Sequence, residues 1–203
     1  MPNAEVDLCN RALSRLGTRA TIAALSENST EARTVSIWYA ATRDALLRAH
    51  DWNFARRRIA LAELGSPSPR DKGGWAYRFA LPSDCLRLLR LEAPPGQPSP
   101  RFEVAGDGGG NGGGRVVLCD EAAPRAVYTA RIADPALFDP GFAQALVDQL
   151  AAHVAYPVTQ KTDLAVRLAQ AARLALAEAM AADSREAGRD GEEWLPDWIA
   201  ARA

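Results

Sequence analysis

The sequence lacks a membrane-spanning segment and a secretory signal. No apolar run approaches the ~20 residues that a helix needs to cross a bilayer, and the first residues, Met1 to Asp7, are acidic. A secretory signal instead begins with positive charge and continues into an apolar core. We therefore expect a protein that is made and folded in a cytoplasm.

Cysteine and histidine are scarce. Cys9, Cys85 and Cys119 are far apart and form no CxxC pair, which favours reduced, buried thiols over a disulfide framework or a zinc site. His50 and His153 each lie near the end of a predicted helix, without an HExxH motif. The sequence therefore predicts no metal site and no cofactor, and it gives little support to catalysis.

Neither sign of charge is in excess, because 24 basic and 25 acidic side chains leave a net charge of -1. Such a chain has no global basic field that would attract nucleic acid or an anionic membrane. The one dense basic cluster is Arg56, Arg57 and Arg58. In a strand, Arg57 points away from the other two. The cluster therefore favours a charged edge strand or, alternatively, an ion-pair surface against a neighbouring subunit.

Apolar residues recur at helical spacing in four segments, over residues 4–16, 30–50, 140–157 and 160–184. Gly17 is a suitable C-cap for the first helix, and Ser29 begins the second. The third helix is expected to end at Pro157, because proline lacks the amide that continues the hydrogen-bond ladder.

Between the two helix pairs the pattern changes to that of short strands. Residues 52–64 suit an extended segment, and alternating residues predict strands over 75–81, 85–91, 101–104, 115–119 and 125–132. We expect an α+β protein that is mainly helical, a four-helix bundle from the N- and C-terminal helix pairs with an inserted small antiparallel β module. The bundle comprises residues 1–51 and 139–185, the β module 52–138, and a C-terminal tail 186–203.

A glycine-rich run covers residues 106–114. Gly108, Gly110 and Gly113 satisfy a GxGxxG pattern, but a strand follows them where a phosphate-binding loop needs a helix N-terminus. The run therefore predicts a flexible hairpin tip rather than a dinucleotide site. A tip with so few side chains can order on contact with a partner ring.

The C-terminal tail carries the best-specified candidate contact. Trp194 and Trp198 are four residues apart, as are Leu195 and Ile199, so one short helical segment would present both tryptophans together. Tryptophan is a frequent anchor of protein interfaces. The tail either docks on another chain or folds back on its own bundle.

Four blocks of residues, between about residue 6 and residue 160, carry a family resemblance. They are Leu8 to Gly17; Tyr39, Arg43-Asp44, Leu47, Trp52-Asn53-Phe54-Ala55 and Arg57-Arg58; Tyr77 and Leu81 to Arg87; and Phe138 to Phe142, Leu146, Leu150-Ala151 and Pro157-Val158-Thr159. In this combination and order they resemble the tail tubular protein A family of short-tailed phages, also called head–tail connector or adaptor proteins.

The resemblance implies a structural protein without catalysis or cofactor. It implies a homo-oligomeric ring of about twelve copies, assembled in the host cytoplasm and present in the virion at the head–tail interface. The other implied partners are the portal protein and the next tail component, a nozzle or tail-completion protein. DNA would pass through the lumen without sequence-specific binding, and no membrane is involved. The lack of a strong basic face suits a channel through which DNA slides.

Two groups of residues are assigned to the contacts that such an adaptor ring would make. Portal contacts are assigned to Trp194, Leu195, Trp198 and Ile199. Contacts with the tail component or a neighbouring subunit are assigned to Arg56, Arg58, Gly108, Gly110 and Asn111. The glycine-rich run and the C-terminal tail depart from the family pattern, so these assignments rest on residue chemistry.

Two other classes of protein stay open. A virion-associated glycan hydrolase would need two facing carboxylates about 5–9.5 Å apart, which can come from distant parts of the chain. A bacterial helical interaction or regulatory module would be supported by a basic recognition helix, and none stands out in the sequence.

Overall fold

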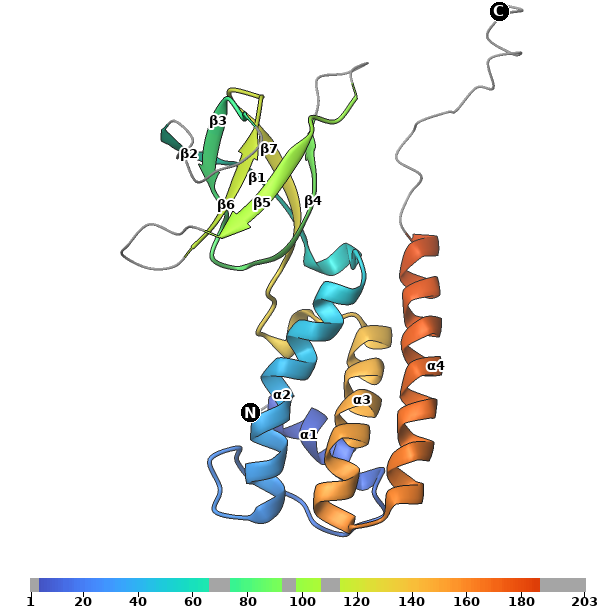
Figure 1. The fold of residues 1–203 in the computed structure, drawn as a ribbon. Helices are drawn as coiled ribbons and strands as arrows, with labels where there is room; N and C mark the ends of the chain where they lie inside the picture. Colours follow the sequence, from blue (N-terminus) through green and yellow to red (C-terminus); the bar gives the residue numbers. More distant parts are fainter. Residues whose placement is uncertain (1–3, 66–73, 93–97, 107–113, 187–203) are drawn as a thin grey trace, which may run out of the picture.

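The computed structural model of the protein describes residues 4–65, 74–92, 98–106 and 114–186 (Figure 1). Of these residues, 50% are helical and 23% lie in strands. Within them the fold is α+β, with two antiparallel sheets of three and four strands beside the helices. The prediction of a mainly helical protein with a small β module is therefore wrong.

The described α-helices lie close to the predicted segments. They are α1 (Ala4–Ser14), α2 (Thr30–Ala49), α3 (Pro140–Thr159) and α4 (Thr162–Glu186). The side chain of Ser29 accepts a hydrogen bond from the amide of Ala32 at the start of α2. Asp139 accepts from the amides of Gly141 and Phe142 at the start of α3. Each cap satisfies amides that a helix N-terminus leaves without a partner.

Helix α3 continues through Pro157, where the sequence predicts its end. Proline removes only its own amide from the ladder, and the turn around it is closed by other groups. The Thr159 hydroxyl donates to the carbonyl of Ala155 at 2.7 Å, and the Gln160 amide donates to the carbonyl of Tyr156 at 2.9 Å. The helix ends at Gln160, whose φ of 58° is left-handed.

The helices do not form the predicted four-helix bundle. In such a bundle each helix packs against neighbours around a shared core. Here α3 is central, and it packs against α1, α2 and α4 (Figure 1). The cause is its composition, since a helix that is apolar on most sides is buried on most sides. Its buried residues are Phe142, Ala145, Leu146, Val147, Leu150, Ala151, Val154 and Ala155.

Seven described strands form the β module. They are β1 (Arg56–Ala60), β2 (Ala62–Gly65), β3 (Tyr77–Ala80), β4 (Cys85–Glu92), β5 (Phe102–Gly106), β6 (Arg115–Cys119) and β7 (Arg125–Ala130). One sheet has the order β1-β7-β4 and the other β2-β3-β6-β5. The predicted extended segment thus supplies a strand to each sheet, and the chain crosses between the sheets at Leu61.

An aromatic cluster joins the helices to the β module; its members are Trp52, Phe54, Phe138 and Phe142. The ring of Phe142 lies 5.1 Å from Trp52, 5.1 Å from Phe54 and 5.0 Å from Phe138, centroid to centroid. Trp52 is fully buried, and its indole N–H donates to the carbonyl of Leu46 at 2.9 Å. One continuous core therefore runs from the helices into the two sheets.

The end of α4 is fastened to this junction by Asp183, which is 5% exposed. Its Oδ2 lies 2.9 Å from His50 Nε2, and its Oδ1 accepts the amide of Asn53 at 3.1 Å. The side-chain amide of Asn53 donates to the Asp183 carbonyl at 2.8 Å. A buried carboxylate is tolerated here because both of its oxygens have partners.

We expect Asp183→Ala to destabilise the protein by about 2–3 kcal/mol, because the substitution leaves buried donors of His50 and Asn53 without an acceptor. Urea unfolding followed by circular dichroism measures the loss. The matched control is Ser184→Ala, whose exposed hydroxyl donates only within its own helix, to Met180. It should change stability by less than about 0.5 kcal/mol. Equal losses in the two variants would contradict the role of Asp183.

Candidate functional site

The three-stranded sheet carries a group of arginines on one face. We call it the arginine face; its members are Arg56, Arg58, Arg87, Arg90 and Arg125. Residues directly opposite one another in an antiparallel pair share a face of the sheet. In the first row across the sheet, Thr129 of the central strand β7 lies between Arg56 and Arg87.

The second and third rows extend the same face. Val127 lies between Arg58 and Arg90, and Arg125 lies between Ala60 and Glu92. Strand β4 has irregularities between residues 85 and 87 and between 88 and 90. The second bulge, between residues 88 and 90, brings Arg87 and Arg90 onto one face, although regular alternation would separate them.

Carboxylates balance part of this charge. Arg56 binds Asp51 through two hydrogen bonds of 3.1 and 3.0 Å. Glu92 is shared, since its two oxygens lie 3.3 Å from Arg58 Nε and 3.2 Å from Arg125 Nε. The side chains of Arg58 and Arg125 are still 52% and 62% exposed. Arg58 and Arg125 therefore share one carboxylate, and Arg87 forms no ion pair with a described residue, so positive charge is in excess among these three arginines.

The centre of the arginine face carries the small side chains of Val127 and Thr129. Val127 and Thr129 are fully buried, and long arginine side chains can lay their aliphatic stems over small neighbours. The Thr129 hydroxyl has no hydrogen-bond partner within the described part of the chain. The guanidinium groups are thus the prominent polar groups of this surface.

The sequence identified only part of this site. It placed Arg56 and Arg58 on a common face, and the structure also brings them together there, with Arg57 on the opposite face beside Tyr128. It missed Arg87, Arg90 and Arg125. The sequence shows the arginines of β4 and β7, but it does not show the strand pairing that brings them onto one face.

The other candidate residues lie outside the described residues. They are Gly108, Gly110 and Asn111 of the glycine-rich run, and Trp194, Leu195, Trp198 and Ile199 of the C-terminal tail.

Large apolar side chains are exposed on both outer helices of the helical body. Ile37 on α2 is 71% exposed, and Leu174 on α4 is 68% exposed. Trp38, beside Ile37, stacks on His153 of α3 with ring centroids 4.7 Å apart and planes inclined by 3°. Tyr156, one turn further along α3, is also exposed. Exposed large apolar side chains thus lie on α2, α3 and α4.

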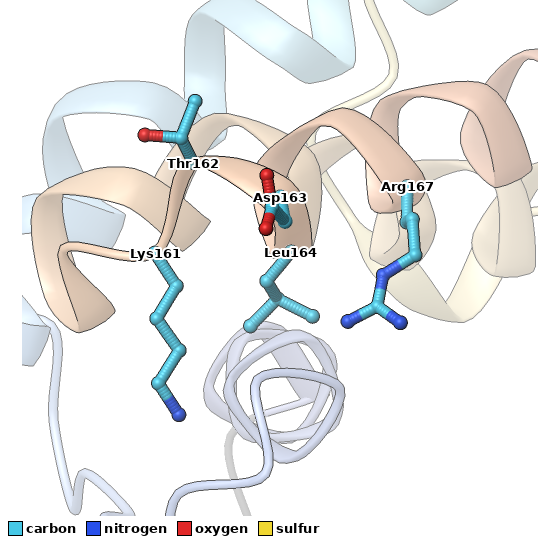
Figure 2. Close-up of a pocket in the computed structure, with 5 residues that line it drawn as sticks. All are labelled: Lys161, Thr162, Asp163, Leu164 and Arg167. Atoms are coloured by element: carbon cyan, nitrogen blue, oxygen red, sulfur yellow. The ribbon is translucent and has the colours of Figure 1, made fainter.

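A hollow of about 420 Å³ lies at the start of α4. Its lining residues are Lys161, Thr162, Asp163, Leu164 and Arg167. Figure 2 shows the side chains of Lys161 and Arg167 extending on either side of Leu164. All lining residues are exposed or half-buried, so the hollow is an open surface feature, and we assign it no ligand.

The cysteines are neutral thiols at ordinary pH. Burial raises the pKa of Cys9 to about 12 and that of Cys85 to about 11, and it also raises the pKa of Cys119. All three are free and buried. Within the described ranges, no group of three or more histidine, cysteine or carboxylate side chains could hold a metal ion.

No family model matches the chain, and no curated protein is similar to it. Among the described helices, none is both long and apolar enough to span a membrane.

His153 should make stability depend on pH. Burial lowers its pKa below the ordinary value of 6.5, because desolvation disfavours the imidazolium ion. As pH falls through 6.5 toward the lower native pKa, the unfolded chain takes up the proton first, and stability is lost. We expect His153→Gln to lose less stability than the wild type between about pH 7.5 and pH 5, measured by urea unfolding.

The comparison is internally controlled, because the two proteins differ only at residue 153. Equal losses in wild type and variant would contradict this role of His153.

Proposed function

We propose that the protein is a structural head–tail adaptor of a tailed phage. In this role, copies form a ring that joins the portal to the tail and surrounds the DNA channel. Its location is the virion, at the head–tail interface. The observation that carries the proposal is the exposure of the large apolar side chains Ile37 on α2 and Leu174 on α4, taken together with the family resemblance of the sequence blocks.

Residues that carry the family resemblance lie in the core or make contacts within the fold. Tyr39 and Trp52 are buried in the core. The carboxylate of Asp84 accepts from the hydroxyl of Tyr128, and Arg43 pairs with Asp44 at 2.8 Å. These positions support a likeness in fold. The functional argument therefore needs the surfaces as well.

The two outer helices offer different surfaces on different sides of α3. Figure 1 shows α3 between α2 and α4. On α2, Ile37 lies on the side away from the buried residues Val35 and Tyr39, and on α4, Leu174 lies away from Ala172. A contact between two unlike patches is heterologous, and such contacts close into rings when the rotation between subunits allows it.

We expect the purified protein to form rings that native mass spectrometry and electron microscopy detect, alone or on the portal. Ile37→Asp and Leu174→Asp should each abolish the ring, because a charge would have to be buried between subunits. The control is Leu137→Asp. Leu137 is 56% exposed in the short 3-10 helix Pro135–Leu137, and its substitution should leave assembly unchanged.

A protein that stays monomeric at all concentrations and ignores the portal would reject the adaptor proposal. Rings that persist in both aspartate variants would reject these two surfaces only.

Portal binding by the C-terminal tail is tested separately. Deletion of residues 190–203 should weaken binding to the portal while ring formation continues, because the deletion removes Trp194, Leu195, Trp198 and Ile199. Co-sedimentation of the ring with purified portal measures the loss. Unchanged binding would remove the tail from the proposal.

A further inference from the structure

We propose that the arginine face binds the phosphate backbone of duplex nucleic acid without regard to sequence. The ligand class is a polyanion with paired phosphate oxygens. The face is complete within a single copy, so this inference does not rest on the adaptor proposal and would hold for a monomer.

The charge of the face supports a polyanionic ligand. Arg58 and Arg125 share the one carboxylate of Glu92, and together with Arg87 they leave two positive charges in excess, on a chain whose net charge is -1. Arg87 is exposed and forms no ion pair with any described residue. Guanidinium groups bind phosphate through two parallel hydrogen bonds, and they remain charged at every physiological pH.

The layout of the face suits a backbone rather than a small anion. Strands β1 and β4 flank β7, so their arginines lie about 10 Å apart across the sheet, since neighbouring strands are separated by ~4.8 Å. Along β1, Arg56 and Arg58 are about 6.7 Å apart, which is two strand residues. The positive charges therefore spread over an area that several phosphates could occupy together.

The composition of the face favours nucleic acid over protein as the ligand. Apart from its arginines, its paired positions hold only Ala60, Glu92, Val127 and Thr129. None of these is a large apolar side chain that the core of a protein interface would bury. Interfaces with DNA are more polar and much more positive than those between proteins.

The same composition indicates which form of nucleic acid the arginine face recognises. The paired positions of this face carry no aromatic side chain, and base stacking on aromatic rings is the usual mode of single-strand binding. Contacts to phosphate position a protein but do not read sequence. A duplex backbone, bound through charge alone, is therefore the ligand that fits.

The test measures binding of a fluorescent duplex of random sequence to the full-length protein by anisotropy, over a series of salt concentrations. For the wild type, log K should fall linearly with log salt, with a slope of about -2 if two phosphates are neutralised. Arg87→Gln should weaken binding and make the slope shallower by about 1. Because Arg87 is exposed, the variant should keep the wild-type melting temperature.

The matched control is Arg173→Gln, an exposed arginine on α4, which should leave both affinity and slope unchanged. A wild type that does not bind the duplex at about 50 mM salt would overturn the proposal. Equal effects of the two substitutions would also overturn it. Polyglutamate serves as the second probe: a face that binds polyglutamate but not duplex DNA would show that its ligand is an acidic protein.

Discussion

The packing of Trp52 against Phe142 is the contact on which the rest of the structure depends. Trp52 follows α2 and precedes β1, and Phe142 lies in the first turn of α3, the helix that every other helix contacts. The two rings therefore fix where the chain leaves the helices and where it returns to them. The carboxylate of Asp183 attaches the end of α4 to the same region through hydrogen bonds with His50 and Asn53. The helical body and the β module are thus positioned by one small, mostly aromatic region, in which each buried ring contributes about 1.5–3 kcal/mol.

Helix positions were predictable because their signals are local. Ser29 caps α2, and the apolar spacing places all four helices within a few residues of their observed bounds. The predicted four-helix bundle is wrong because α3 buries more than the single stripe of Phe142, Leu146, Leu150 and Val154, which lie at four-residue intervals. Ala145, Val147 and Ala151 are buried as well, and apolar residues on several sides of a helix indicate a central position. That signal was present in the sequence.

The arginine face could not be predicted because it depends on register. Its members come from β1, β4 and β7, which are separated by long stretches of chain. A shift of one residue moves a side chain to the other face, and the irregularity between residues 88 and 90 of β4 places Arg87 and Arg90 together. No local pattern indicates that bulge. The sequence therefore shows the arginines of β1 as a divided cluster, whereas strand pairing combines Arg56 and Arg58 with three further arginines.

The contacts proposed for the arginine face and for the exposed apolar side chains would respond differently to salt. Apolar contacts between subunits do not weaken with salt, whereas phosphate contacts weaken steeply. A surface with few excess charges would bind a backbone weakly and without sequence preference, and such binding lets a protein slide along DNA. The lack of a strong basic face in the sequence was expected to suit a channel through which DNA slides. A local and partly neutralised face would meet the same requirement, because Glu92 and Asp51 limit how strongly the arginines can hold a phosphate.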